Sequence, residues 1–290
     1  MISLPSGQPL PTAHRRLLSD LADLLDLPQL VVYGGAARDL LSASPGSPKD
    51  VDVAAGPLSR AAGCRERLLE HPDVQEVGPA RDYWIRMTEP VIMFDVRWRG
   101  MTVDVNFLDD LGKIGHFDVE CVRWEHPAGT FVDPYRVTGR ETTDSFALVS
   151  PMDVENPVLL LNRLVKLSAK YDVDYTQVGE LSHLASELVE AAAAWNSADE
   201  FHGTQADTAH ARAIATSVQR ARDGAAFLRV CLDSGVIACR NPRLAEVLAR
   251  DPSAVTRLAR TTSPDSFWHL ANSLTSDRSS SPLGAKETRR

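Results

Sequence analysis

The residues with the clearest chemical potential lie in two short segments near the start of the chain. The first, Val31–Asp39, carries the pair Gly34 and Gly35 between an apolar run and a helical pattern. Because glycine has no Cβ atom, backbone N–H groups at such a strand-to-helix turn can approach a phosphate closely. The second places Asp50 and Asp52 on one face of a short strand, since side chains in a strand alternate between its two faces. Carboxylates beside a phosphate-binding turn favour Mg²⁺ and a nucleoside triphosphate, because hard cations take oxygen ligands and substrate phosphates complete their shell.

A third carboxylate stands on a later strand of the first half. In the segment from 102 to 108, Asp104 shares one face with Thr102 and Asn106, while apolar residues take the other face. Asp104 is therefore available on a strand that could lie beside the first pair of carboxylates. Three nearby carboxylates compete for the same role: Asp95, Asp109 and Asp110.

The pattern of apolar residues predicts the elements that position these side chains. The expected helices of the first half are Ala13–Leu25, Ala36–Leu41 and Ser59–Glu70. The expected strands are Leu30–Tyr33, Asp50–Ala54, Val74–Val77, Trp84–Met87, Ile92–Trp98, Thr102–Leu108, Val119–Trp124 and Thr130–Val132. A break at Arg99-Gly100 predicts a hairpin between the fifth and sixth of these strands.

After Pro151 the sequence becomes rich in Ala, Leu, Arg and Glu and predicts helices. The expected helices are Val158–Ala169, Val178–Trp195, Thr208–Cys231 and Leu244–Ala259. The polar stretch from 196 to 207 is expected to be a loop. We therefore expect three parts, namely a head domain at 1–150, a helical domain at 151–272 and a tail of disordered composition at 273–290.

Composition favours a soluble protein of the cytoplasm. Hydrophobic residues make up 43% and charged residues 24%, as in ordinary globular domains, and no apolar run approaches the roughly 20 residues of a membrane span. The N-terminus lacks the basic start and apolar core of a secretory signal. The four cysteines show no C-x-x-C pairing, which indicates neither a zinc site nor a disulfide framework. The net charge of −8 argues against a broadly basic surface for nucleic acid, because non-specific affinity rests on phosphate neutralisation.

These motifs resemble the head domain of the tRNA CCA-adding enzymes and bacterial poly(A) polymerases, within the DNA polymerase β-type nucleotidyltransferase superfamily. That family carries a G-G-x-x-R-D turn, a K-D-x-D strand and a third carboxylate on a later strand. The matching residues here are Gly34, Gly35, Arg38, Asp39, Lys49, Asp50, Asp52 and Asp104. Two later family segments are echoed weakly at 115–121 and 129–135, so that the resemblance spans about residues 28 to 170.

The resemblance implies an α+β fold, with a mixed-sheet head flanked by helices and an all-α C-terminal domain. It also implies transfer of a nucleoside monophosphate from a nucleoside triphosphate to an acceptor hydroxyl, with release of pyrophosphate and with two Mg²⁺ ions as cofactors. The implied roles are metal ligation and catalysis at Asp50, Asp52 and Asp104, and nucleotide contacts at Gly34, Gly35, Arg38 and Asp118.

The chain departs from the family where the base is selected. In the tRNA enzymes an E-D-x-x-R motif on the first helix after the head supplies an Asp and an Arg that select CTP and ATP. The aligned stretch here has Asn156 in place of the Asp and Leu159 in place of the Arg. The amide of Asn156 can still face a base, whereas Leu159 cannot, so the base preference is not carried over. Arg163 and Lys166 follow at helical spacing and are expected to present cations to the triphosphate instead.

Each assignment has a structural alternative. The alternatives are a solvated strand end for the D-x-D pair, an ion pair at a helix start for Arg38, ordinary surface charge for Lys49, and the polar face of a helix for Arg163 and Lys166. For Asp118, a nucleotide-ribose or structural role stands against plain exposure. His116 is expected to be a turn or partly buried residue rather than a catalytic base.

Three hypotheses for function remain open at this point. The first is an active nucleotidyltransferase whose acceptor is a tRNA 3′ end or other RNA, a small molecule or a protein side chain. The second is a nucleotide-binding regulatory protein that kept the fold and lost turnover, motivated by the missing E-D-x-x-R motif. The third is a nucleic-acid-binding module in the helical half. The carboxylate series favours the first, while the sequence determines neither the base, nor the acceptor, nor the oligomeric state.

Overall fold

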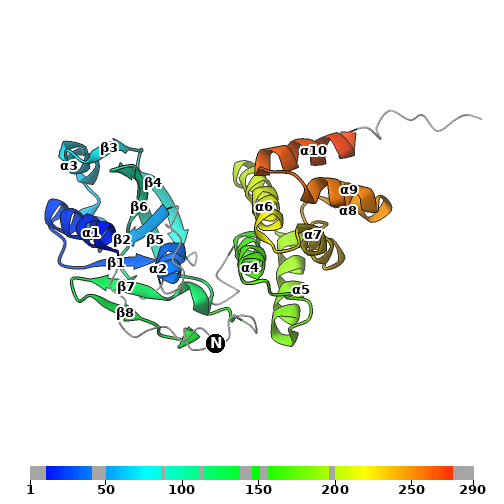
Figure 1. Ribbon diagram of the computed structural model, residues 1–290, viewed down its shortest axis with the longest axis horizontal. Helices are drawn as coiled ribbons and strands as arrows, with labels where there is room; N and C mark the ends of the chain where they lie inside the picture. Colours follow the sequence, from blue (N-terminus) through cyan, green and yellow to red (C-terminus); the bar gives the residue numbers. More distant parts are fainter. Residues whose placement is uncertain are drawn as a thin grey trace, which may run out of the picture. The chain divides into compact units, whose positions relative to one another are not determined.

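The computed structural model describes residues 11–40, 50–85, 89–111, 114–137, 146–150, 156–195 and 200–276 (Figure 1). Its contacts divide the chain into two compact units, Met1–Asn156 and Pro157–Arg290. The first unit combines a mixed sheet with helices, and the described part of the second consists of helices. The predicted α+β fold class is therefore confirmed.

A mixed sheet is the framework of the first unit. Its described strands are β1 (Leu30–Tyr33), β2 (Asp50–Ala54), β3 (Val74–Val77), β4 (Arg81–Ile85), β5 (Glu89–Trp98), β6 (Met101–Phe107), β7 (Arg123–His126) and β8 (Thr130–Val132). Their order is β3-β5-β6-β2-β1-β7-β8, with β4 also paired to β5. Strands β2 and β6 run parallel, whereas the other pairs are antiparallel. The parallel pair places the D-x-D strand directly beside the strand that carries Asp104.

One face of the sheet packs into the main hydrophobic core. α1 (Thr12–Leu25) contributes leucines at helical spacing, and α3 (Cys64–Glu70) adds further apolar residues. β2 contributes Val51 and Val53, both buried in this core. Because side chains alternate along a strand, the aspartates between and before these valines face the other side of the sheet. α2 (Gly34–Leu40) begins directly after β1.

The other face of the sheet is apolar at one end and polar at the other. A small buried cluster at the apolar end comprises Val31, Ala54, Val91, Leu108 and Ile114. The strands that supply this cluster carry Asp50, Asp52 and Asp104 toward the polar end. This polar end is the face on which the predicted site residues lie.

Seven helices make up the described part of the second unit. They are α4 (Pro157–Tyr171), α5 (Gly179–Ala194), α6 (Glu200–Arg220), α7 (Gly224–Asp233), α8 (Pro242–Arg250), α9 (Pro252–Ala259) and α10 (Pro264–Ser276). α4 packs against α5 and α6 through an apolar face. A buried polar contact joins two of these helices, because Oδ1 of Asn162 lies 2.6 Å from Nδ1 of His210.

Two long helices expected from the sequence are each broken in the structure. The expected helix 208–231 ends at Arg220, and α7 starts after Asp223, whose carboxylate accepts hydrogen bonds from two backbone N–H groups of the first turn. The expected helix 244–259 is interrupted at Asp251, whose carboxylate caps α9 by accepting a hydrogen bond from the backbone N–H of Ser253. In both places a local capping residue prevails over a continuous apolar pattern.

Other boundaries also differ from the sequence prediction. The polar stretch expected to be a loop is helical from Glu200, and α10 continues through Ser276, four residues into the expected tail. The expected helix 59–70 is a 3₁₀ turn followed by α3, separated at Gly63, where φ is 68°. The expected strand 119–124 starts with the 3₁₀ turn η3 (Asp118–Glu120) before β7. Residues 277–290 lie outside the described part of the chain, and none of the described helices is long and apolar enough to cross a membrane.

Candidate active site

The D-x-D strand has the two-faced character that its sequence predicts. Val51 and Val53 are buried in the core, while Asp50 is exposed and Asp52 is partly exposed. The expectation that both carboxylates share a face opposite the valines is therefore confirmed. The roles of these carboxylates in catalysis remain a prediction.

Strand register aligns three carboxylates across the sheet. Asp52 on β2 lies opposite Asp104 on the parallel strand β6, and Asp104 lies opposite Asp95 on the antiparallel strand β5. The next row holds Asp50, Thr102 and Arg97 on the same three strands. Adjacent strands are about 4.8 Å apart, so the three aspartates form a continuous acidic row. The expected adjacency of Asp104 and the D-x-D strand is thus confirmed.

The glycine pair lies directly against this row. β1 ends at Tyr33, which pairs with Asp52, so the next residue, Gly34, comes beside the Asp52 side chain. Gly34 has φ of 67°, and a Cβ atom placed on it would lie 2.5 Å from Oδ2 of Asp52. A Cβ atom on Gly35 would meet no heavy atom within 4 Å. The first glycine is required for the turn to approach the carboxylate, and the second leaves open space beside it.

The crowding of these carboxylates changes the acidity of Asp104. Burial is the main reason that its pKa rises from 3.8 to about 7, followed by the negative charge of Asp52 and a side-chain hydrogen bond with Asp95. Burial opposes the charged form of Asp104, and the neighbouring carboxylates add a negative field that a bound cation would offset. The oxygen donors and this field both fit a divalent cation of the Mg²⁺ type.

Two of the three competing carboxylates have other partners. Asp95 forms an ion pair with Arg81 of β4. Asp109, after the end of β6, accepts a hydrogen bond of 3.0 Å from the backbone N–H of Leu58. Asp104 therefore occupies the row position directly beside Asp52, while Asp109 fastens a 3₁₀ turn.

Comparison with known proteins gives a likeness in structure. No protein-family model matches the chain, and no curated protein matches it in sequence. The Thermotoga maritima CCA-adding enzyme complexed with tRNA superposes with a TM-score of 0.53 at 14% identity, over 97% of this chain and 69% of that one. A CCA-adding enzyme solved with ATP gives 0.54 at 15% identity, over 93% and 67%. A tRNA-processing enzyme in an apo form gives 0.55 at 13% identity, over 88% and 67%.

The chain has the fold of the CCA-adding enzymes. The resemblance drawn from the glycine pair and the D-x-D strand is thereby confirmed at the level of fold. Identities of 13–15% make the chain a divergent member of this fold and leave its activity to be tested.

The structure describes the remaining predicted nucleotide-contact residues only in part. Arg38 belongs to α2, but its side chain and that of Asp39 lie outside the described part, as does Lys49. Asn156 precedes α4 and is partly exposed, and Arg163 and Lys166 are exposed on α4 itself. Contacts of these residues with a nucleotide remain predictions.

Asp118 is buried and hydrogen-bonded to the backbone. One of its carboxylate oxygens accepts from the N–H groups of Val119 and Ala147, at 2.8 and 2.9 Å. The alternative of plain exposure is therefore wrong, because only 1% of the residue is exposed. These contacts give Asp118 a structural role, and a nucleotide contact remains a prediction.

Sequence reasoning missed a neighbouring acid, Glu120. Its buried carboxylate accepts hydrogen bonds from the backbone N–H groups of His116 and Phe117, at 3.2 and 3.3 Å. The available signal was an acidic residue three positions after the start of a turn, which is the spacing of a capping box. His116 is also buried, with Nδ1 3.3 Å from the hydroxyl of Ser150, in keeping with a structural position.

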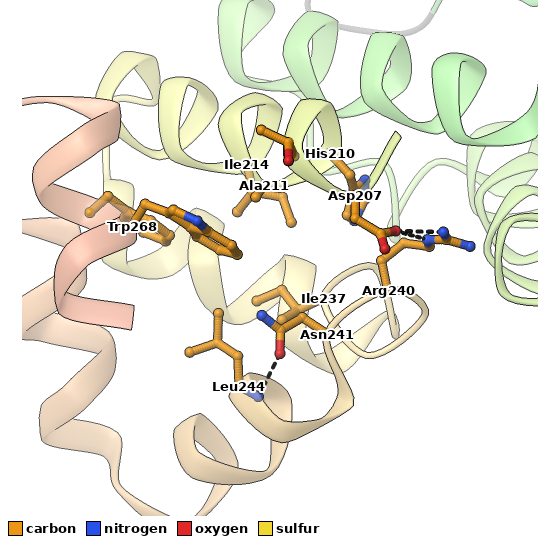
Figure 2. A pocket seen from close by; sticks show the side chains of 11 residues that line it. Asp207, His210, Ala211, Ile214, Ile237, Arg240, Asn241, Leu244 and Trp268 are labelled. Carbon is orange, nitrogen blue, oxygen red and sulfur yellow. Dashed lines mark hydrogen bonds and ion pairs between the residues drawn. The ribbon is translucent and has the colours of Figure 1, made fainter. Parts of the chain in front are cut away.

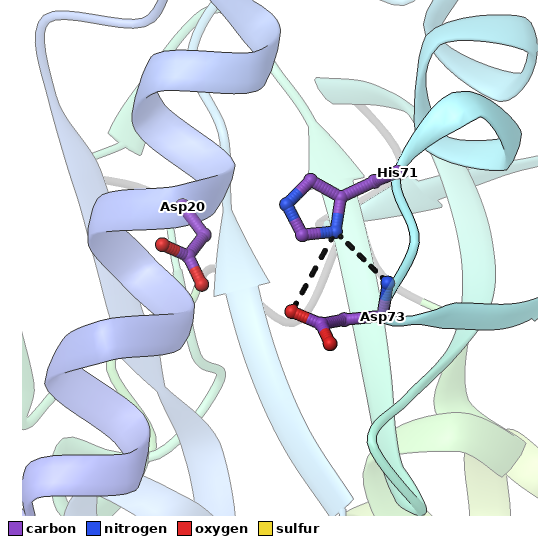
Figure 3. A group of neighbouring side chains, drawn as sticks. All are labelled: Asp20, His71 and Asp73. Atoms are coloured by element: carbon purple, nitrogen blue, oxygen red, sulfur yellow. Dashed lines mark hydrogen bonds and ion pairs between the residues drawn. The ribbon is translucent and has the colours of Figure 1, made fainter.

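A second group of potential ligands lies beside α1, which packs on the core-covered face of the sheet (Figure 3). Asp20, His71 and Asp73 bring one ligand atom each within 4.8 Å of one another, a spacing that could hold a metal ion. However, Arg99 forms an ion pair with Asp73, and Nε of Arg16 lies 3.9 Å from Oδ2 of Asp20. Because these arginines already balance the carboxylates, we interpret the group as two ion pairs, one within α1 and one between the turn after α3 and Arg99.

A cavity of about 160 Å³ lies within the helical unit (Figure 2). Arg240 at its edge pairs with Asp207 and donates hydrogen bonds to the carbonyl oxygens of Ala192 and Trp195. Asn241 accepts from a backbone N–H in the first turn of α8. Arg240 thus joins helices and Asn241 caps α8, so we assign the cavity no ligand.

Proposed function

We propose that the protein is a Mg²⁺-dependent nucleotidyltransferase that moves a nucleoside monophosphate from a nucleoside triphosphate to an acceptor hydroxyl and releases pyrophosphate. The observation that carries this proposal is the pairing of Asp52 with Asp104 across parallel strands, directly beside Gly34. This arrangement brings carboxylates and an accessible backbone turn to one place on the sheet, as transfer chemistry requires.

The three carboxylates Asp50, Asp52 and Asp104 have the roles of metal ligands in this proposal. Two Mg²⁺ ions, when bound, would stabilise charge on the attacking and leaving oxygens. Asp50 and Asp52 would hold both ions, and Asp104, which lies opposite Asp52 on β6, would complete the site. The glycine turn, which lies against the side chain of Asp52, would bind the phosphates.

Phosphate and base contacts are assigned to two regions. Backbone N–H groups of Gly34 and Gly35 would bind the outer phosphates, and Arg38 would add a bidentate contact. Asn156 would offer its amide to the base, and Arg163, together with Lys166 one turn later, would add positive charge. The change from Arg to Leu159 predicts a base selection that differs from CTP and ATP selection by the E-D-x-x-R motif.

The acceptor is proposed to be RNA. Support comes from solved structures of the same fold in which a CCA-adding enzyme is complexed with tRNA, and others are complexed with ATP or CTP. A small molecule or a protein side chain is the alternative acceptor, because the sequence lacks the base-selecting pair of the tRNA enzymes.

Incubation with each α-³²P-labelled nucleoside triphosphate, Mg²⁺, and either total cellular RNA or cell extract tests the proposal. Label should move into RNA, and the Asp50→Ala/Asp52→Ala double variant should lose this transfer. Asp109→Ala is the matched control, since it removes a nearby carboxylate that fastens a turn. Mg²⁺-dependent nucleotide binding without transfer to any acceptor would contradict the proposal and favour the regulatory alternative.

A further inference from the structure

Tyr33 continues the acidic row onto a fourth strand, and no role has yet been given to its side chain. It is the last residue of β1 and the direct antiparallel partner of Asp52 on β2. Direct partners share a face of the sheet, with their Cβ atoms about 5 Å apart. The row therefore runs from Tyr33 through Asp52 and Asp104 to Asp95. An aromatic ring thus lies beside the proposed metal ligands, on the same face of the sheet.

The ring of Tyr33 packs against the small apolar cluster at the other end of this face. Two members of the cluster, Val31 and Ala54, are fully buried and stand two residues away from Tyr33 and Asp52 along their strands. Tyr33 itself remains partly exposed. Apolar packing therefore holds the ring, while part of its surface stays accessible.

Tyr33 also directly precedes the turn to which the phosphates are assigned. A Cβ atom on Gly34 would lie 2.5 Å from Oδ2 of Asp52, whereas a Cβ atom on Gly35 would enter open space. In the proposed function the outer phosphates bind this turn, and Asp52 ligates the cations. The triphosphate is then held next to Tyr33, and the nucleoside extends from it along the face of the sheet.

The two ends of this face offer a nucleoside different surroundings. On one side of the carboxylate row, the described residues Asp50, Thr102 and Arg97 are polar and exposed. On the other side lies the apolar cluster, with Tyr33 packed against it. A nucleobase has flat aromatic faces that stack on an aromatic side chain, and this stacking stabilises binding without charged partners. The Tyr33 end therefore suits the nucleoside better than the charged end does.

We infer that Tyr33 provides a stacking surface for the nucleoside of the bound nucleotide. This inference rests on the proposed function, in which the glycine turn and Asp52 hold the triphosphate. Stacking uses the face of a base, which every base possesses, so this contact adds affinity without strong base preference. Such a contact suits a chain with Leu159 in the place of the base-selecting Arg of the family.

Calorimetric titration of the full-length protein in Mg²⁺ with each nucleoside triphosphate, and with inorganic tripolyphosphate, provides the test. Tripolyphosphate presents the phosphates without a nucleoside. Tyr33→Leu keeps an apolar cover over the cluster and removes the aromatic face. It should weaken the binding of all four nucleotides by about 5–100-fold and leave tripolyphosphate binding within about twofold of the wild-type value. Tyr33→Phe keeps the ring and should bind both kinds of ligand within about threefold of the wild-type protein.

Transfer kinetics separate stacking from a displacement of the metal ligands. Stacking acts on the bound nucleotide and on the transition state alike, so Tyr33→Leu should raise KM for the nucleotide and leave kcat unchanged. A displaced Asp52 would lower kcat instead. Urea denaturation shows whether each variant is folded, and Tyr33→Phe keeps the test available if Tyr33→Leu is not.

A loss of nucleotide binding in Tyr33→Leu that spares tripolyphosphate, with wild-type binding in Tyr33→Phe, supports the inference. Equal losses for nucleotides and tripolyphosphate would overturn it, because Tyr33 would then act through the turn or the metal ligands. A similar loss in Tyr33→Phe would assign the contact to the hydroxyl group and overturn stacking. Wild-type nucleotide binding in Tyr33→Leu would also overturn the inference and leave the proposed function intact. If the wild-type protein shows no Mg²⁺-dependent nucleotide binding that requires Asp50 and Asp52, the proposed function fails, and the inference fails with it.

Discussion

A Cβ atom on Gly34 would lie 2.5 Å from Oδ2 of Asp52, so the turn after β1 and the D-x-D strand meet at a distance that only glycine permits. The backbone of Gly34 has φ of 67°, which is also unfavourable for other residues. The two motifs are therefore one structural unit. A change in the turn must displace the carboxylate.

Gly34→Ala is expected to reduce nucleotidyl transfer by about 100-fold, because a small displacement of a reacting group can cost that much. The strained backbone should also lower the free energy of unfolding by about 1–3 kcal/mol. Transfer assays and urea denaturation measure the two effects. Gly35→Ala is the matched control for folding, since its Cβ atom enters open space, and it should keep wild-type stability. Wild-type activity in Gly34→Ala would show that the contact with Asp52 is unimportant.

The raised pKa of Asp104 predicts a pH-dependent stability of the metal-free protein. Burial and the neighbouring carboxylates raise this pKa from 3.8 to about 7, so the folded protein holds a proton that the unfolded chain has released between about pH 4 and pH 7. The free energy of unfolding should therefore fall as the pH rises through this window. Asp104→Asn should remove this part of the slope in urea denaturation with EDTA. Parallel curves for the two proteins would contradict the prediction.

Metal binding should stabilise the protein through the site face. Mn²⁺ at about 100 times its dissociation constant should add about 2.7 kcal/mol to the free energy of unfolding, because it binds the folded state. This gain should disappear on chelation and in Asp50→Asn/Asp52→Asn. His71→Ala should retain it, since His71 belongs to the group beside α1. Loss of the stabilisation in His71→Ala alone would place the ion at that group instead.

Asp118 is expected to affect stability directly. In Asp118→Ala the N–H groups of the buried Val119 and of Ala147 lose their acceptor, which should lower the free energy of unfolding by about 1–3 kcal/mol. Urea denaturation measures this loss, and nucleotide affinity measured below the transition should stay unchanged if the role is structural. Wild-type stability together with weaker nucleotide binding would instead favour the nucleotide contact expected from the family.

Local sequence patterns, namely strand alternation and turn residues, predict much of the first unit. Alternation in β2 placed Asp50 and Asp52 opposite the valines, and the hairpin at Arg99-Gly100 follows from two residues with φ of 47° and 80°. Helices were harder to delimit, because the apolar pattern continues across breaks. The breaks could have been predicted from Asp223 and Asp251, because aspartate is a preferred N-cap residue and each caps the helix that follows.

The sequence by itself determined which residue types could do the chemistry, namely a glycine pair, a D-x-D strand and several later aspartates. It favoured Asp104 as the third carboxylate over Asp95, Asp109 and Asp110 only through the family resemblance. That choice depends on β2 and β6 running parallel in one register, although they lie about fifty residues apart. Such pairing is decided by packing of the whole sheet against its core, which no local periodicity encodes. The tertiary structure thus places Asp104 beside Asp52 and pairs Asp95 with Arg81. It also brings Asp109 to the backbone N–H of Leu58, which donates a hydrogen bond to it.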